Sequence, residues 1–209
     1  MTMLNVTIHH HQKGSILIIS LLFLIILTII SITSISTSVM EQKSLTNSFN
    51  IQRAFEASEF GLRSAEDYIK AMTVKPVAQK ACTPTCDVIW EKDRVGQLYG
   101  GSYPNQWWAV ANKVTDNAWW KATAHTQPTL LDPNGAAVKD NLSYVVTQPR
   151  FVIEEIAFIP DDLNPNTRAK GVGLTYYRIT SRGTGAESSQ NGIDPNQSYV
   201  QSVFGKRFN

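Results

Sequence analysis

Histidine and cysteine are scarce in this sequence, and their scarcity limits the metal and redox chemistry it can carry. Three of the four histidines are His9 to His11, so His125 is the only one outside the first few residues. The two cysteines, Cys82 and Cys86, have a spacing that matches neither the CxxC redox motif nor the common zinc patterns. We therefore expect no metal site and no cofactor.

Catalytic signatures are also absent. The sequence has no GxSxG elbow, no HExxH, no P-loop and no GxGxxG. Glu154 and Glu155 are adjacent and would point to opposite faces of a strand, which places them poorly for paired acid–base work. The net charge of +2 over 209 residues gives no basic footprint for nucleic acid. We predict that the protein is not an enzyme and does not bind nucleic acid.

Charge is absent from one long stretch, Gly14 to Met40, which is flanked by Lys13 and Glu41. Residues 15–35 are dense in Ile and Leu, and their number matches the ~20 apolar residues that a helix needs to cross a ~30 Å hydrocarbon core. The stretch lacks the alternation of a barrel strand, and only helices and closed barrels satisfy their backbone in lipid. We predict that residues 15–40 form a membrane-spanning helix.

Three interpretations of this stretch compete. A secretory signal would be cut after its apolar region, and Ser34 to Ser36 resemble such a site. A plain membrane anchor would not be cut. The third interpretation rests on the junction Gln12-Lys13-Gly14-Ser15, where a short polar leader ends in Lys-Gly and the apolar run begins at once. This layout favours a cut before the run, which leaves the helix on the mature protein.

The junction resembles the class III signal of type IV prepilins. The resemblance implies that a prepilin peptidase cuts after Gly14 and methylates the new amino group of Ser15. Glycine suits such a site because a residue without a side chain lies extended and close in a protease cleft. Lys13 would hold the leader on the cytoplasmic side, in line with the positive-inside rule.

From Glu41 the pattern becomes amphipathic. Apolar and small residues recur at alternating steps of four and three, the spacing of one helical face. This expected packing stripe comprises Ile51, Phe55, Ser58, Leu62, Ala65, Ile69 and Met72. No strong breaker precedes Pro76, so we predict one helix from about Ser15 to Met72.

The C-terminal part is rich in β-branched and aromatic residues. Four strands are expected at Tyr144–Thr147, Phe151–Ile159, Leu174–Ser181 and Ser198–Phe204, and a short one at Asp87–Trp90. The order of the four predicts an antiparallel meander that covers the amphipathic helix, an α+β arrangement. We expect a leader at residues 1–14, a transmembrane half-helix at 15–40, an amphipathic half-helix at 41–75 and a globular domain at 76–209.

Two blocks resemble the PilX group of type IV pilus minor pilins. Residues 53–66, RAFEASEFGLRSAE, are similar to the group's AFxAAExxLRxAE helix, and residues 176–185, YYRITSRGTG, are similar to its YRITxRGxG strand. The resemblance implies a pilin-like α+β fold with a single pass through the inner membrane. The C-terminal domain would face the periplasm, and the protein would later enter the pilus, where the tip is one available position.

One position departs from the major pilins of that family, which carry Glu at the fifth mature position to pair with a neighbour's methylated amine. Counted from Ser15, that position is Ile19. An uncompensated buried amine is unfavourable, so a chain without the Glu is poorly suited to repeat along a filament. The resemblance implies a minor pilin of a priming or tip complex that promotes assembly by helix packing. Expected partners are other minor pilins, the major pilin, prepilin peptidase, the inner-membrane assembly platform and membrane lipid.

Other readings remain open. A minor pseudopilin of a type II secretion system would carry a larger domain, often with metal sites. A tip-exposed adhesin is hinted at by the pairs Trp107-Trp108 and Trp119-Trp120, which would serve either as a glycan platform or as core.

Cys82 and Cys86 would form a short disulfide loop or stay free thiols. The loop 161–166 offers oxygen ligands for Ca²⁺ or is a solvated turn, and it lacks the Gly and Glu of an EF-hand.

Overall fold

The computed structural model describes residues 15–80, 88–92, 118, 120–121, 125–126, 142–163, 165–187 and 194–208. The chain divides into two units, residues 1–46 and 47–209, and each is described by itself. Several residues singled out above lie outside the described residues: Gly14, Cys82, Cys86, Trp107, Trp108, Trp119 and Asn164.

One helix, α1 (Ser15–Ala71), contributes to both units. It ends one residue before the predicted Met72, and Pro76 follows where the chain can no longer be helical. In the first unit every described residue, 15–46, is exposed. This is the one helix among the described residues that is long and apolar enough to cross a membrane.

Eight hydroxyl groups in the described part of the first unit are satisfied inside the helix itself. Each of these donates to a carbonyl oxygen about one turn earlier, as Ser20 does to Leu17 at 2.9 Å and Ser31 to Leu27 at 2.8 Å. The same arrangement holds for Thr28, Thr33, Ser34, Ser36, Thr37 and Thr46. These polar residues therefore interrupt neither the helix nor its apolar character.

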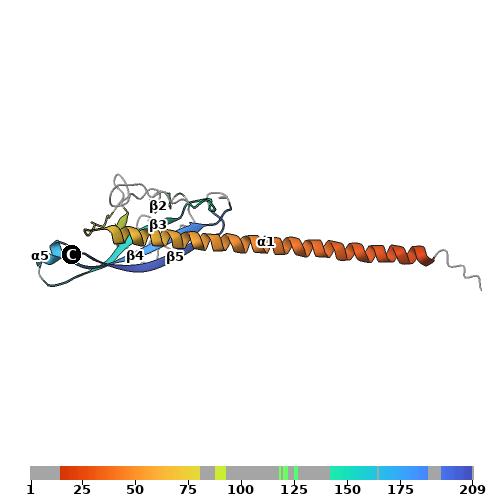
Figure 1. Ribbon diagram of the computed structural model, residues 1–209, viewed down its shortest axis with the longest axis horizontal. Helices are drawn as coiled ribbons and strands as arrows, with labels where there is room; N and C mark the ends of the chain where they lie inside the picture. Colours follow the sequence, from red (N-terminus) through yellow and green to blue (C-terminus); the bar gives the residue numbers. More distant parts are fainter. Residues whose placement is uncertain are drawn as a thin grey trace, which may run out of the picture. The chain divides into compact units, whose positions relative to one another are not determined.

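The second unit contains a five-stranded sheet with the order β1-β3-β4-β5, and β2 also pairs with β3. The strands are β1 (Ile89–Glu91), β2 (His125–Thr126), β3 (Arg150–Pro160), β4 (Gly173–Thr184) and β5 (Gln197–Phe208). A short helix, α5 (Pro165–Ala169), connects β3 to β4. Figure 1 shows the last part of α1 lying along this sheet, with α5 at the far end of β3 and β4.

The predicted meander is present as β3, β4 and β5, which pair antiparallel over long registers such as Ile153↔Ile179 and Ile179↔Ser202. The sheet as a whole is mixed, which the prediction of an antiparallel meander did not include. The reason is β1, which runs parallel to β3 with Ile89 opposite Ile153. The architecture is α+β and pilin-like, with the long N-terminal helix packed on the sheet.

The strand predicted at Tyr144–Thr147 does not form. Val146 N–H bonds Gly185 O at 3.1 Å, but the pairing then passes to a side chain. Thr147 N–H bonds Thr184 Oγ1 at 3.3 Å, and that hydroxyl donates to Thr147 O at 2.9 Å. The Gln148 amide also bonds Leu142 O at 2.8 Å and closes residues 142–148 into a loop. β-branched composition favoured a strand, and these local side-chain bonds prevailed over it.

The core lies between α1 and one face of the sheet. Its buried members are Ala65, Ile69, Ile89, Phe151, Ile153, Tyr177, Ile179 and Phe208. Two glycines, Gly183 in β4 and Gly185 just after it, let the helix approach closely. A Cβ at Gly183 would overlap backbone atoms of Ala54 and Ser58, and a Cβ at Gly185 would lie 2.8 Å from Asn50 O.

Candidate functional site

The apolar start of α1 is the first surface with functional potential. Ser15 is its first residue, and its first turn contains no acidic residue. Ile19 lies one turn further on and is exposed, as are its apolar neighbours within the first unit. A surface of this length and composition is stable only against lipid or against other apolar helices.

The structure divides the expected packing stripe into two groups. Ser58, Ala65 and Ile69 are buried, and Leu62 and Met72 pack partly buried against the core. Ile51 and Phe55 are about half exposed, at 50% and 47%. They lie beside the buried face, not on it.

The buried face at that level is made of smaller residues. Asn50, Ala54 and Ala57 are buried there, and the first two lie against Gly185 and Gly183. The helix and the sheet are too close for a large side chain between them. The sequence did carry a signal for this face, because Ala54, Ala57 and Gly61 recur at steps of three and four.

The opposite face of the sheet holds a buried ionic cluster. Arg182 Nη2 donates a 2.9 Å hydrogen bond to Asp194 Oδ2, and Thr147 Oγ1 donates to the same oxygen at 3.2 Å. The Arg182 guanidinium lies 5.8 Å from the ring centroid of Trp120. Trp120 is fully buried, so it offers no exposed platform for a glycan. The cluster joins three separate segments to the sheet.

Two groups beside this cluster have shifted pKa values. Burial lowers the pKa of Arg150, and the nearby Arg182 charge lowers it further. Burial raises the pKa of Tyr199 to about 12, against the opposing effect of Arg182. No nucleophile–base pair stands in the cluster as described, and its contacts are those of a structural connection.

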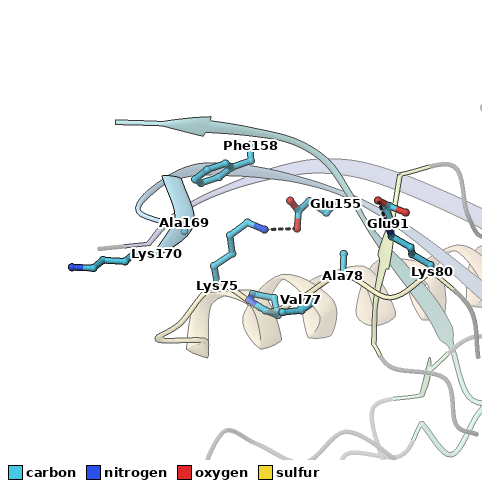
Figure 2. A pocket seen from close by; sticks show the side chains of 11 residues that line it. Lys75, Val77, Ala78, Lys80, Glu91, Glu155, Phe158, Ala169 and Lys170 are labelled. Carbon is cyan, nitrogen blue, oxygen red and sulfur yellow. Dashed lines mark hydrogen bonds and ion pairs between the residues drawn. The ribbon is translucent and has the colours of Figure 1, made fainter. Parts of the chain in front are cut away.

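A cavity of about 470 Å³ opens beyond the C-terminal end of α1 (Figure 2). Its walls come from the segment after α1, from β1 and β3, and from the end of α5. The lining residues are Lys75, Pro76, Val77, Ala78, Lys80, Glu91, Glu155, Phe158, Ala169, Lys170 and Gly171. Sequence reasoning did not bring these residues together.

An ion pair lies inside this pocket. Lys75 Nζ is 2.8 Å from Glu155 Oε2 and 5.3 Å from the ring centroid of Phe158. A bulge in β3 between Glu155 and Ala157 inserts one extra residue. Because of this insertion, Glu155 and Phe158 share one face of the strand although they are three positions apart.

The remaining acidic residues do not assemble a metal site. Glu154 pairs with Arg178 at 3.0 Å, so it is separate from Glu155, which pairs with Lys75. Asp161 accepts a 2.9 Å bond from Arg207. Within the described part of the chain, no group of three His, Cys, Asp or Glu could hold a metal ion.

Two family models match the chain. The model for the type IV pilus assembly protein PilX C-terminal region matches residues 73–206, and the PilX N-terminal model matches residues 13–63. The chain belongs to the PilX family. No curated protein and no solved structure matches it significantly.

Membership of the PilX family confirms the resemblance of residues 53–66 and 176–185 to that group. The protein is a minor pilin of type IV pilus assembly, and its PilX relationship implies contact with other pilus components. PilX proteins form a structural family, and a long apolar N-terminal helix fits membrane anchoring. In this PilX chain, both family-like blocks meet at one place, because Gly183 of the second lies against Ala54 and Ser58 of the first.

Proposed function

We propose that this PilX protein joins a priming or tip complex and promotes type IV pilus assembly through helix packing. The proposal is carried by the exposure of α1 within the first unit and by the lack of charge over most of that length. Its described residues, 15–46, are all exposed, and residues 15–40 carry no charge. Such a helix passes from lipid to a bundle of similar helices without losing apolar contacts. The mechanism is template formation, with no chemical step.

Processing at the N-terminus is part of the proposal. Prepilin peptidase cuts after Gly14, and the new amino group of Ser15 is methylated. Residues 1–14 are then the leader, 15–40 the membrane-spanning half of the helix, and 41–75 the half that packs on the domain 76–209. The domain lies in the periplasm before assembly and on the pilus afterwards. The Lys-Gly junction followed by an uncharged run supports this order.

Ile19 supports a restricted place in the filament. In a stack of subunits, each methylated amine needs a neighbouring acceptor, and the first turn of α1 supplies no carboxylate. A subunit of this kind fits an end position, where no amine depends on it. Its partners there are other minor pilins and the major pilin, held by the inner-membrane platform.

The test measures N-terminal processing and pilus assembly for the same variants, in a strain whose own copy of the gene is deleted. The wild-type chain and Gly14→Val are expressed at equal levels, with Thr7→Ala as a leader control. We expect wild type and Thr7→Ala to begin at N-methylated Ser15 and to restore surface pili. Gly14→Val should keep its leader and restore none.

Intact-mass analysis and counts of sheared pili give the two readouts. An intact Met1 or a start near Ser36 in the wild-type chain would overturn the processing step. Full piliation in the strain without this protein would overturn the assembly role.

A further inference from the structure

The pocket beyond α1 has no part in helix packing, and every residue that lines it belongs to the second unit. Its size of about 470 Å³ falls in the range of ligand sites, roughly 300–1,000 Å³. Figure 2 shows Lys75 rising from one side toward Glu155, with Phe158 beyond them and Val77 and Ala78 below. The pocket therefore combines buried charge with apolar walls.

The Lys75 ammonium has donors to spare. Its side chain is only 20% exposed, and Glu155, its partner, is 17% exposed. An ammonium group carries three N–H donors, and Glu155 is the one acceptor found for it in the described part of the chain. Leaving donors of a largely buried cation unused is unfavourable, so an acceptor that enters the pocket gains free energy from them.

Positive charges outnumber negative ones by one among the described residues that line the pocket. These are three lysines, Lys75, Lys80 and Lys170, and two glutamates, Glu91 and Glu155. The second pair, Lys80 with Glu91, is loose at 4.0 Å, and the Lys80 side chain is 70% exposed. A ligand with a single negative charge neutralises this excess, whereas a dianion would bring a second charge without a partner into the pocket.

Apolar residues form the remaining wall. Pro76, Ala78 and Ala169 line the pocket beside Val77, which is 90% exposed. Together these residues give the charged cavity an apolar wall, as is usual for ligand pockets, and an apolar group of a ligand can cover it. The ligand that matches both features carries its charge and its apolar part close together.

We propose that this pocket binds a monoanionic carboxylate that bears an apolar group. The carboxylate accepts hydrogen bonds from Lys75 Nζ, and the apolar group covers Val77 and Ala78. Two sources share this chemistry, the C-terminal residue of a polypeptide and a free organic acid. The proposal does not rest on the assembly function, because the pocket is complete within the second unit.

The experiment measures fluorescence anisotropy with the purified full chain in a non-ionic detergent. The probe is a fluorescein-labelled Gly-Gly-Leu peptide with a free C-terminal carboxylate, and the matched probe is its C-terminal amide. We expect the acid to bind about tenfold or more tightly than the amide, because the amide loses a charge-assisted hydrogen bond. Equal binding of the two probes, or none of the acid at millimolar concentration, would overturn the proposal.

Matched variants at the pocket rim and outside it test whether the acid probe binds in this pocket. Val77→Asp puts a negative charge at the rim and should weaken acid binding about tenfold, whereas Val77→Lys should strengthen it. Val74→Asp is the control, since Val74 is also exposed, at 73%, and does not line the pocket. Equal effects of Val74→Asp and Val77→Asp would show that the acid binds elsewhere and would refute the assignment.

The ion pair is tested by removing both charges together, because Lys75→Met alone leaves the Glu155 carboxylate without its partner cation. Lys75→Met/Glu155→Gln should abolish binding, while Glu155→Gln alone should retain it and Lys121→Met, an exposed lysine outside the pocket, should leave it unchanged. Retained binding in the double variant would contradict the role of Lys75. Competition by N-acetyl-leucine at matching affinity identifies a free acid as sufficient, and its failure identifies a polypeptide C-terminus.

Discussion

Arg182 donates a 2.9 Å hydrogen bond to Asp194, and the two side chains are only 2% and 0% exposed. The pair connects β4 to the segment just before β5, so it fixes where the last strand begins. A buried charge without its partner is costly, whereas an exposed pair contributes little. This difference gives a direct test of what the pair does.

Arg182→Met should lower the free energy of unfolding by about 3–5 kcal/mol, because it leaves the Asp194 carboxylate buried and unpaired. Arg63→Met is the matched control, since Arg63 pairs with Glu59 at 3.7 Å on an exposed helix face. Its cost should be about 0.5 kcal/mol or less. Urea unfolding of the full chain in detergent measures both. Similar costs for the two variants would contradict a stabilising role for the buried pair.

Gly183→Ala should destabilise the packing of α1 on the sheet by about 1–3 kcal/mol or more. The new Cβ would overlap backbone atoms of Ala54 and Ser58, which cannot move aside as a side chain can. Gly205→Ala is the control, because the nearest atom to its Cβ would be Tyr176 Cε1 at an ordinary 3.4 Å. Thermal unfolding compares the two, and an equal loss would show that the helix is not this close to β4.

Stability should fall in alkaline solution in a way that depends on Tyr199. Burial raises its pKa to about 12 in the folded chain, whereas an unfolded tyrosine titrates near about 10. The folded state therefore holds the proton longer, and this contribution is complete below about pH 10 and lost as pH rises through about 12. Tyr199→Phe should make the unfolding free energy fall less between about pH 9 and 11.5. Parallel slopes for wild type and variant would contradict this assignment.

Phe55→Ser should separate assembly from folding. Phe55 is 47% exposed beside the buried face, so its loss should cost about 1 kcal/mol or less, whereas Ile69→Ser in the core should cost several. If the exposed side of α1 packs on other subunits, Phe55→Ser should reduce the number of pili at near-normal stability. Normal piliation would show that this side of the helix is not a packing surface.

Ile19→Glu should change where the chain enters the filament. A carboxylate at this position could accept from a neighbour's amine, so the variant should appear in sheared pili at a higher copy number than wild type. Ile18→Glu carries the same charge one position away and should not, because insertion of an unpaired carboxylate is unfavourable. Quantitative immunoblots compare the two. An unchanged copy number for Ile19→Glu would argue against the restricted position that we propose.

The main elements could be predicted from the sequence because each has a strong local period. The helix was expected from about Ser15 to Met72 and is α1, Ser15–Ala71. The strand expected at Leu174–Ser181 is β4, Gly173–Thr184, and the one expected at Ser198–Phe204 is β5, Gln197–Phe208. Hydrophobic spacing and β-branched composition contain this information, although the ends of these strands were underestimated and the strand predicted at Tyr144–Thr147 does not form.

The parallel pairing and the pocket could not be predicted in the same way. The three residues of β1 carry no sign of direction, and their partners in β3 lie more than sixty positions away. Lys75 and Glu155 are 80 positions apart, and Phe158 joins Glu155 on one face of β3 only because the strand contains a bulge. A single extra residue in a strand leaves no periodic signal, so no sequence pattern predicts that these side chains lie together.

The hydroxyl groups of α1 affect how residues 15–46 exchange lipid neighbours for protein neighbours. Eight of them already donate to a carbonyl of their own helix, as Thr28 does to Ile25 at 2.7 Å, so these groups present no unsatisfied donor to lipid. The same oxygen keeps a lone pair for a neighbouring helix and needs no rotation to accept from it. The segment is therefore compatible with both lipid and protein neighbours. It can exchange a fatty acyl neighbour for a protein one while its own internal bonds stay unchanged.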